Sequence, residues 1–389
     1  MQVFTVGGAV RDELLGLTVQ DRDYVVVGAT PAEMLAQGFK PVGKDFPVFL
    51  HPKTHAEYAL ARTERKSGHG YRGFAFDAAR EVTLKEDLAR RDLTINAIAR
   101  AGDGTLTDPF HGVADLAARV LRHVGPAFLE DPVRILRVAR FAARFFEFSV
   151  APETVGLMRQ MVDSGEIDHL VAERVWQELA RGLMEARPSR MLAVLHECGA
   201  LARLLPEVDG GENLGLALDA AARRGHELAV RFAVLLRDPG PDSTPPAFDA
   251  AQQAEQTARQ VKRVNAVCAR LKAPADCRDL ALLVARYDID IRRGAQLSAA
   301  NLAKLLETAD ALRRPQRFKQ LLEACSCECH TNPTNQADAA GELFMRALAA
   351  ARSVDAATIA RACSDALQIA ERVHAARVAA VKAALTLPD

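Results

Sequence analysis

The N-terminal segment constrains the fold most strongly, because signals for a strand, a glycine turn and a helix follow one another directly. The run Val3–Val6 is β-branched and aromatic, ends at Gly7 and Gly8, and is followed by the helical pattern of Ala9–Leu15. At such a junction glycine lets the backbone approach a phosphate, and the free N–H groups at the start of the helix attract its charge. The segment therefore predicts a phosphate-binding turn at Gly8, to which Arg11 would add a forked donor.

A pair of carboxylates follows this turn in the sequence. Asp21 and Asp23 immediately precede the strand pattern Tyr24–Val27, so in an extended chain both project from the same face. Two like charges so placed repel each other unless a cation lies between them, and oxygen ligands beside a triphosphate favour Mg²⁺. An isolated Asp-x-Asp is more often a solvated strand end, but the nearby glycine turn strengthens the metal interpretation. Asp21 and Asp23 are therefore predicted to be the catalytic pair that holds Mg²⁺.

Composition sets wide limits on the class of protein. The chain has 389 residues, of which 49% are hydrophobic and 26% charged, so it can bury a large core and should form more than one domain. Lys plus Arg and Asp plus Glu both number 50, so no global basic field indicates nucleic acid. Any RNA-binding surface must therefore be local.

The sequence carries no signal for a membrane or for an oxidising compartment. It begins with a strand pattern and contains no apolar run approaching about 18 residues. Its seven cysteines are an odd number in a long chain, which argues against a disulfide framework and for reduced thiols. We therefore expect a cytoplasmic protein without a membrane partner, and no obligate protein partner is evident.

The order of the N-terminal motifs resembles a known family. Residues Gly7–Asp12 read GGAVRD, and with the following LLG and DRD they are similar to the bacterial tRNA nucleotidyltransferases (CCA-adding enzymes) and to the related bacterial poly(A) polymerases of the polymerase-β-like superfamily. The resemblance implies an α+β fold: a nucleotidyltransferase head with a base-reading helix (1–140), a helical neck (141–210), and a helical body and tail with a degenerate HD-like region (211–389). Glu57 would then be either a third acidic group or an exposed strand carboxylate.

Two further stretches of the head resemble family motifs. Residues 62–74 are rich in glycine, basic and aromatic residues and are similar to the flexible loop of the family, with a solvated hairpin as the alternative. Residues 84–99 have helical spacing and contain an Arg-Arg-Asp that resembles the family motif RRDFTINA. By that resemblance Arg91 and Asp92 contact the ribose and triphosphate of the incoming nucleotide, and Asn96 is a further candidate. Without the resemblance, Arg91 and Asp92 would be expected to form a surface ion pair that contributes little to stability.

Residues 130–146 predict an amphipathic helix, with Asp131 as its N-cap and Pro132 at its first position. Apolar side chains fall on one face, namely Ile135, Val138, Ala139, Ala142 and Phe146. Arginines fall on the other side and predict a local basic surface, namely Arg134, Arg137, Arg140 and Arg144. A solvated helix face would account for them equally well.

The start of this helix, EDPVRILR, resembles the EDxxR motif with which the family reads the incoming base. A carboxylate can accept a hydrogen bond from the amino group of C or A, while a neighbouring guanidinium donates one to the ring acceptor of the same base. By this resemblance Asp131 and Arg134 select C and A against U and G. Arg137 and Arg140, farther along, are suited to the phosphates of the triphosphate or of the primer.

The second half of the sequence is helical in pattern and carries two weaker signals. Many relatives have a metal-dependent HD phosphohydrolase domain here, but Arg237 stands where the histidine is expected, and a guanidinium does not bind a cation. We therefore predict no phosphohydrolase activity. Cys325, Cys327 and Cys329, with His330, are clustered as in some zinc sites, but their spacing does not match a Cys-x-x-Cys knuckle, so metal binding stays open.

The resemblance predicts an RNA-binding transferase that processes and repairs the 3′ end of tRNA. It would add C, C and A without a template, using CTP and ATP with Mg²⁺ and releasing pyrophosphate, and it would bind the 3′ end, the acceptor arm and the T arm of tRNA. A poly(A) polymerase, or a partial enzyme that adds only CC or only A, is the nearest alternative. An RNA-binding protein with an inactive site is the alternative from another class, which the intact Asp21 and Asp23 disfavour.

Overall fold

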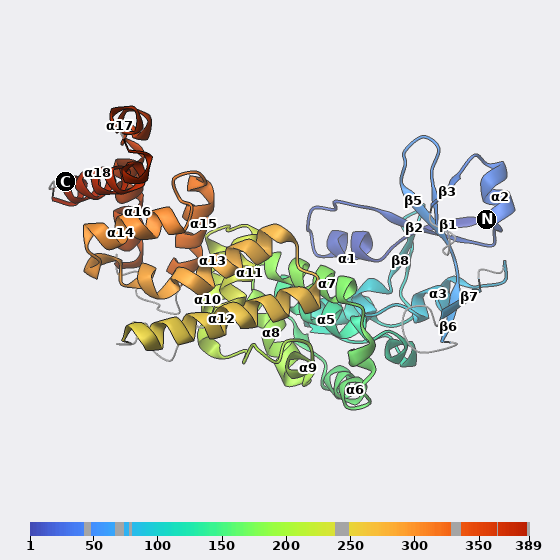
Figure 1. The fold of residues 1–389 in the computed structure, drawn as a ribbon. Helices are drawn as coiled ribbons and strands as arrows, with labels where there is room; N and C mark the ends of the chain where they lie inside the picture. The colour runs from blue at the N-terminus through green and yellow to red at the C-terminus, as the bar shows by residue number, and fades with distance from the viewer. Residues whose placement is uncertain are drawn as a thin grey trace. The chain divides into compact units, whose positions relative to one another are not determined.

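The computed structural model describes residues 1–42, 48–66, 74–77, 80–237, 249–327, 336–363 and 365–386. The chain forms two compact units (Figure 1). The first consists of Met1–Gly182 and Arg190–Pro206, and the second of Leu183–Ser189 and Glu207–Asp389. The regions expected to form the head and the neck therefore fall almost entirely within one unit.

A seven-stranded mixed sheet organises the first unit, in the strand order β3-β4-β5-β2-β1-β8-β9. Its strands are β1 (Gln2–Val6), β2 (Asp23–Val27), β3 (Lys40–Val42), β4 (Val48–Leu50), β5 (Glu57–Leu60), β8 (Ala99–Ala101) and β9 (Leu106–Thr107). β1 lies antiparallel to both β2 and β8, whereas β2 and β5 are parallel. The predicted strands at the start of the chain are thus central in the sheet.

Both faces of the sheet are covered, because successive residues of β2 point to opposite sides. Val25 packs in a cluster with Val6, Ala97 and Leu88 of helix α3 (Leu84–Ala89). On the other face, Val26 packs in a cluster with Met34 of helix α2 (Pro31–Ala36), Phe39, Phe49 and Leu60. The continuous apolar run of β2 follows from this double burial.

Two short helices of the head begin at hydroxyl caps. Thr30 and Thr83 each accept the backbone N–H of a glutamate three residues on, and that glutamate accepts the N–H of the threonine, which completes a capping box. α3 ends at Ala89, so the prediction of a helix over residues 84–99 is wrong after that point. The remainder is a turn and the 3₁₀ helix η1 (Thr94–Asn96), since Asp92 accepts the Leu93 N–H and the Asn96 side chain in place of continued helix.

The expected loop over residues 62–74 is bounded by strands. β6 (Thr63–Lys66) and β7 (Phe74–Asp77) pair antiparallel in a separate two-stranded sheet, while residues 67–73 lie outside the described part of the chain. A second small sheet pairs β10 (Val120–Leu121) with β11 (Ser149–Val150) in parallel.

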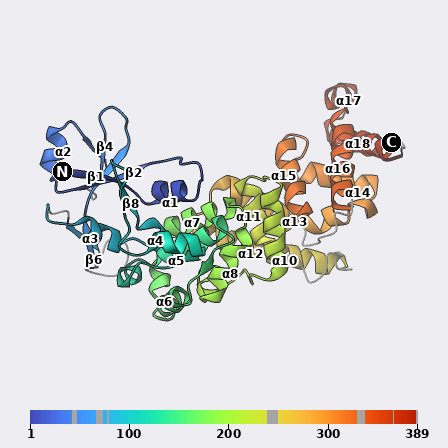
Figure 2. The same ribbon diagram turned by 180° about the vertical axis from the view of Figure 1, so that it is seen from behind.

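The other helices of the first unit are α1 (Gly8–Leu14), α4 (Gly112–Ala118), α5 (Val133–Arg144), α6 (Pro152–Asp163), α7 (Ala172–Met184), α8 (Pro188–Glu197) and α9 (Ala200–Leu204), with 3₁₀ turns η2 (Pro126–Glu130) and η3 (Glu166–His169). Helices α1, α5 and α7 lie side by side in both views (Figures 1 and 2). Ile135, Val138, Ala139 and Ala142 of α5 are fully buried, as their spacing predicts. Phe146, expected on the same face, follows the end of the helix and is 42% exposed.

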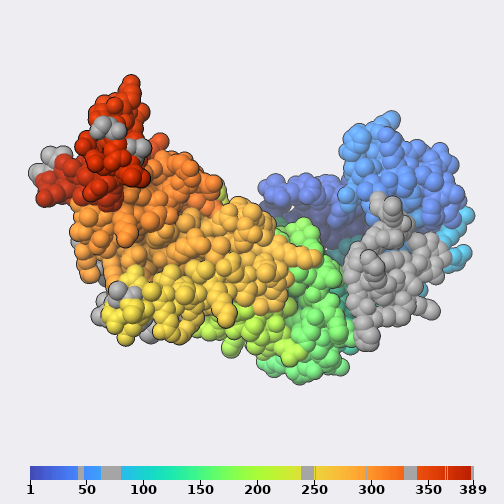
Figure 3. Space-filling view, in the orientation of Figure 1, coloured from blue at the N-terminus to red at the C-terminus, as the bar shows by residue number. Residues whose placement is uncertain are grey.

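The described part of the second unit contains helices and no strand. Its helices are α10 (Glu212–Arg223), α11 (Leu228–Leu236), α12 (Ala250–Leu271), α13 (Ala275–Arg292), α14 (Ala299–Thr308), α15 (Pro315–Ser326), α16 (Gln336–Arg352), α17 (Ala356–Ala362) and α18 (Ala366–Thr386), with one 3₁₀ turn, η4 (Gly294–Gln296). α11 is buried along its length, whereas α12 lies on the surface of the unit (Figure 3). Among the described residues, no helix combines the length and apolarity needed to cross a membrane.

Candidate active site

The glycine turn between β1 and α1 packs against the side chain of Arg91. Gly7 has a φ of 69°, and a Cβ added there would lie 2.9 Å from Nη1 of Arg91. The Gly7 N–H donates to the carbonyl of Ile98 over 3.3 Å, and the Gly7 carbonyl accepts the N–H of Arg11 over 3.1 Å. Gly8 is the first residue of α1 and is half-buried. The turn therefore needs glycine at position 7 both for its backbone conformation and for the close approach of Arg91.

Arg91 retains a donor that no described residue accepts. Its Nη2 donates to Asp87 over 3.3 Å and its Nη1 to the carbonyl of Asn96 over 3.4 Å. Its Nε is buried and has no hydrogen-bond partner in the part of the chain that the structure describes. A buried donor without an acceptor is costly, so this atom favours an anionic ligand at the glycine turn.

The predicted metal pair lies at the end of β2 next to that turn. Asp23 is the first residue of β2 and is paired across the sheet with Val6, the last residue before the glycines. Both Asp21 and Asp23 are exposed, while Arg22 between them pairs with Glu13 of α1 over 2.6 Å. Strand pairing therefore brings Asp23 beside the glycine turn, with two accessible carboxylates that have the oxygen chemistry of a divalent-cation site.

Glu57 lies on the strand next to the metal pair. β5 runs parallel to β2 with Tyr24 opposite Tyr58, and their rings stack with centroids 4.5 Å apart. Glu57 precedes Tyr58 as Asp23 precedes Tyr24, so the two acidic residues start adjacent strands at the same level. This placement supports the interpretation of Glu57 as a third acidic group.

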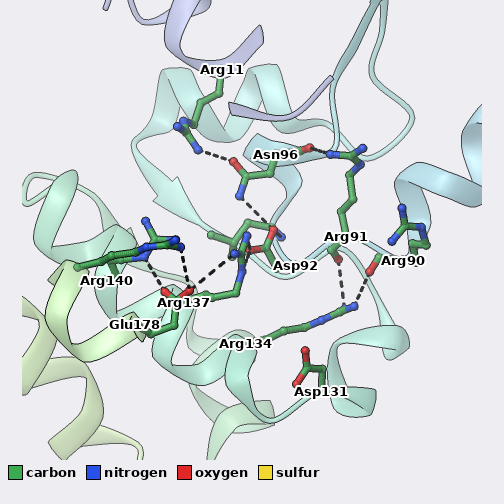
Figure 4. Close-up of polar contacts among 12 residues, drawn as sticks. Arg11, Arg90, Arg91, Asp92, Asn96, Asp131, Arg134, Arg137, Arg140 and Glu178 are labelled. Atoms are coloured by element: carbon green, nitrogen blue, oxygen red, sulfur yellow. Dashed lines mark hydrogen bonds and ion pairs between the residues drawn. The ribbon is translucent and has the colours of Figure 1, made fainter. Parts of the chain in front are cut away.

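Arg11 lies in the interior rather than at the open turn (Figure 4). It is 3% exposed, and it donates from Nε to Asp12 over 2.8 Å and from Nη1 to Oδ1 of Asn96 over 2.6 Å. Its guanidinium lies 5.1 Å from the ring centroids of both Phe141 and Phe145. Burial lowers the pKa of Arg11, partly offset by Asp12. Arg11 thus connects α1 to α5 and to the η1 turn.

Asp92 continues this set of contacts toward α5. Its Oδ1 accepts the side-chain amide of Asn96 over 3.0 Å, and its Oδ2 accepts Nε of Arg137 over 2.7 Å. Burial alone would raise the pKa of Asp92, but the attraction of Arg137 and the hydrogen bonds from Asn96 and Arg137 lower it well below its usual range. Asp92 in turn raises the pKa of Arg137. The predicted site residues Arg11, Asp92 and Arg137 are therefore brought together by tertiary structure.

The predicted basic surface on α5 needs correction. Arg134 and Arg140 are only 7% and 8% exposed, because polar groups from distant segments cover them. Arg140 donates from Nε to Glu178 of α7 over 2.6 Å. Of the four arginines, only Arg137 and Arg144 keep about a third of the side chain exposed. The arginine side of the helix was predicted to form a local basic surface, but carboxylates and carbonyls accept most of its hydrogen bonds.

The two residues predicted to read the base are held by different partners. Arg134 donates to the carbonyls of Arg90 (2.6 Å), Ala127 (3.0 Å) and Arg91 (3.5 Å). Asp131 precedes α5 and accepts the Val133 N–H over 3.2 Å, so it caps the helix start one residue from the expected position. Figure 4 shows Asp131 and Arg134 near each other at this end of α5.

Several residues that organise the site were missed in the sequence. Asp87 is fully buried and accepts from Nε of Arg90 over 3.1 Å and from Nη2 of Arg91, and the arginines overcome the effect of burial and lower its pKa. Its spacing of three and four residues from the two arginines on a helix was the available signal. Asp12 lies within the GGAVRD motif, but nothing local indicated that it or Glu178 would be buried with an arginine.

Arg237, which stands where the family resemblance leads us to expect a metal-binding histidine, is buried in the second unit. Arg237 donates from Nη1 to the carbonyls of Ala324 (2.9 Å) and Cys325 (2.8 Å), and its Nε lies 3.4 Å from Oδ1 of Asp288. Cys325 and Cys327 are buried, and burial raises the pKa of Cys327 to about 11. Cys329 and His330 lie outside the described residues, within which no group of three potential metal ligands occurs.

Comparison with protein families identifies the class. Residues 3–122 match the family described as "Poly A polymerase head domain", and residues 147–210 match that described as "Probable RNA and SrmB- binding site of polymerase A". The fold and site therefore define a nucleotidyltransferase with a polymerase A type head followed by helices.

Full-length relatives identify the family more closely. The chain is 61% identical over 404 residues to the multifunctional CCA protein of Azoarcus sp., covering 98% of this chain and 97% of the relative. It is 59% identical over 406 residues to that of Dechloromonas aromatica, covering 100% and 98%. The crystal structure of the Bacillus stearothermophilus CCA-adding enzyme in complex with CTP is 25% identical with a TM-score of 0.67, covering 98% of this chain and 89% of that one. The chain belongs to the family of the multifunctional CCA proteins.

These findings confirm the family resemblance and the α+β fold class predicted from the sequence motifs.

Proposed function

We propose that this chain completes the 3′ end of tRNA by adding C, C and A from CTP and ATP, with release of pyrophosphate. The observation that carries the proposal is membership of the multifunctional CCA protein family over the whole chain, at 61% identity to one relative. The chain is accordingly a tRNA nucleotidyltransferase whose substrates are tRNA, CTP and ATP. A tRNA substrate assigns the reaction to the cytoplasm, and the helices that follow the head would contact the acceptor and T arms.

Asp21 and Asp23 are the residues that would hold the divalent cation, which we take to be Mg²⁺. Their exposure, their oxygen chemistry and the pairing of Asp23 with Val6 beside the glycine turn support this assignment. When bound, Mg²⁺ supplies Lewis-acid stabilisation of the charge on the attacking and leaving oxygens. Glu57, at the same level on the adjacent strand, is placed to support the pair.

The nucleotide would be held by the glycine turn and by arginines near it. Gly8 offers its backbone to the phosphates, and the buried Nε of Arg91 offers a donor. Arg137 keeps about a third of its side chain exposed and is suited to a phosphate. Arg11, Asp92 and Arg140 are buried and paired, so they act on the nucleotide chiefly by positioning Arg137 and the turn.

Asp131 and Arg134 would choose the base. The amino groups of C and A are donors that a carboxylate accepts, whereas U and G present a carbonyl at the corresponding position and are repelled. The proximity of the two side chains at the start of α5 supports this role (Figure 4).

Incorporation on a tRNA transcript that lacks its terminal CCA tests the proposal. The reactions would contain Mg²⁺ with CTP, ATP, both, UTP or GTP, and products would be resolved to single nucleotides. We expect two additions with CTP alone, three and then a stop with CTP and ATP, and none with UTP or GTP. Asp21→Asn and Asp23→Asn should abolish addition without loss of stability, whereas Asp163→Asn, at an exposed position on α6, should leave it unchanged.

Other product patterns would identify the alternatives. Long tails from ATP alone would indicate a poly(A) polymerase, and a stop after two additions in the presence of both nucleotides would indicate a CC-adding enzyme. An enzyme that extends only a transcript already ending in CC would be an A-adding one. Tight tRNA binding without any addition would indicate an inactive RNA-binding protein.

We also propose that the chain lacks phosphohydrolase activity. Arg237 stands at the expected metal-binding histidine, and its guanidinium is directed into the carbonyls at the end of α15, which supports a structural role. Hydrolysis of a generic phosphomonoester by the purified protein should stay at background with Mg²⁺, Ni²⁺ or Mn²⁺. Metal-dependent turnover that persists in Asp21→Asn would contradict this proposal.

A further inference from the structure

Arg174 of α7 donates two hydrogen bonds to the carboxylate of Asp131, the residue proposed to select the base. Its Nη1 donates to Oδ1 of Asp131 over 3.0 Å and its Nη2 donates to Oδ2 over 2.7 Å. This is a parallel fork in which both carboxylate oxygens are engaged, although 43 residues separate the partners. The side chains of Arg174 and Asp131 are 26% and 19% exposed, so the pair is partly shielded from water but reachable from the site.

A pair of parallel hydrogen bonds of this kind fixes the rotation of the carboxylate of Asp131. The terminal torsion of an aspartate side chain is broad, so its carboxylate plane rotates readily. Two parallel hydrogen bonds to a planar guanidinium hold that plane, and a carboxylate has about four lone-pair positions. Oδ1 also accepts the Val133 N–H, so Oδ2, with Arg174 as its one partner among these bonds, retains a position for a further donor. Asp131 can thus accept the amino group of a base while Arg174 keeps its orientation.

The two proposed base-reading residues are held by different segments of the chain. Arg134 is anchored by the carbonyls of Arg90 and Arg91, which belong to the Arg-Arg-Asp segment of the head. Asp131 is anchored by Arg174, which belongs to α7. The relative position of the acceptor and the donor that meet the base is therefore set jointly by the head segment and by α7, not by α5 alone.

We propose that Arg174 is a specificity-determining positioning residue, which sets the carboxylate plane of Asp131 and thereby the discrimination of C and A from U and G. The inference rests on the proposed base-reading role of Asp131. A residue that only tied α7 to the start of α5 would affect stability and would alter the use of all four nucleotides alike.

The test measures kcat and KM for CTP and UTP on a tRNA transcript lacking CCA, and for ATP and GTP on one ending in CC. In Arg174→Ala we expect the ratio of kcat/KM for CTP over UTP, and for ATP over GTP, to fall by about tenfold, the loss expected for one misaligned charged hydrogen bond. Arg174→Lys retains the charge without the fork, so its ratios should also fall while its Tm approaches that of the wild type.

Matched controls separate the inference from the proposed function. Arg159→Ala removes an exposed α6 arginine that pairs with Glu197, and it should change neither ratio. If Asp131→Ala loses discrimination but both Arg174 variants keep it, the role of Asp131 stands and the inference for Arg174 is wrong. If both ratios fall in Arg174→Ala but keep their wild-type values in Arg174→Lys, the charge at position 174 and not the orientation of the carboxylate determines discrimination. That result also overturns the inference. If Asp131→Ala keeps wild-type discrimination, the base-reading assignment itself fails.

Discussion

Arg144 donates from Nη2 to Oδ2 of Asp12 over 2.9 Å, although 132 residues separate them. Asp12 also accepts from Arg11. From Arg11, a series of hydrogen bonds and ion pairs runs through Asn96, Asp92, Arg137 and Glu178 to Arg140. We call these eight residues the α5 ion network. It starts and ends on α5 and joins that helix to α1, to the η1 turn and to α7. The network therefore couples α1, which follows the glycine turn, to α5, at whose start the proposed base-reading residues lie.

Asp12→Asn should destabilise the first unit, because it removes the charge that neutralises a buried Arg11. We expect a loss of about 3 kcal/mol in the free energy of unfolding, as for other broken buried pairs. Urea unfolding monitored by circular dichroism measures this change.

Arg144→Gln is the comparison for Asp12→Asn, because about a third of the Arg144 side chain is exposed and its loss leaves Asp12 paired with Arg11. It should cost less than about 1 kcal/mol. Equal effects of the two substitutions would show that the Arg11–Asp12 pair is not the main link between α1 and α5.

Gly7→Ala should raise the KM for CTP and reduce the free energy of unfolding by about 1–2 kcal/mol. The alanine would have to keep a left-handed backbone conformation, and its Cβ would press on Arg91. Gly104→Ala is the matched control. Gly104 has a φ of 89° with nothing within 4 Å of the added Cβ, so it has similar backbone strain without the contact. A rise in KM of the same size in both variants would argue against the role of Arg91 at the turn.

Asp92 should make stability depend on pH. Its pKa is lower in the folded protein than in the unfolded chain, so its charge stabilises the fold above the ordinary value of about 4, and this contribution declines as the pH falls below that value. Asp92→Asn should lower the free energy of unfolding by about 2 kcal/mol at pH 7. This is less than the loss for a fully buried ion pair, because the Arg137 side chain is partly exposed. In urea unfolding, the difference between wild type and variant should shrink toward pH 3. A difference that is the same at both pH values would contradict the assignment.

Arg237→Met should destabilise the second unit by about 3 kcal/mol, because it leaves Asp288 and the carbonyls at the end of α15 without this buried donor. Arg224→Met is the control, since Arg224 is exposed and donates to Ser326 of the same helix. Thermal unfolding followed by calorimetry compares the two. An unchanged transition in Arg237→Met would show that the arginine does not hold α11 to α15.

The local part of the site was predictable because neighbouring residues decide it. The turn at Gly7 depends on its own φ and on the Arg11 N–H, four residues away. The start of α2 depends on Thr30 and Glu33, three residues apart. The position of Asp23 before an apolar strand follows from alternation along that strand.

The helix predicted over residues 84–99 shows where local pattern is insufficient. Its apolar spacing is that of a helix, but Asp92 bonds to Leu93 and Asn96, and Leu93 bridges to His123. The segment gains more from these contacts than from continued helix. Spacing alone does not reveal that competition.

The sequence by itself determined the family, the order of the elements and the residues that face one another within a strand or helix, since short-range geometry and recognisable motifs specify these. Only the tertiary structure decided which charged residues are buried and with what partner. Arg140 with Glu178 and Asp131 with Arg174 are 38 and 43 residues apart. Arg140 and Glu178 are buried, and Arg174 and Asp131 are partly shielded from water. A charge removed from water is stable only beside its partner, so each pair depends on the tertiary structure that brings α7 to α5 and to the residues just before it.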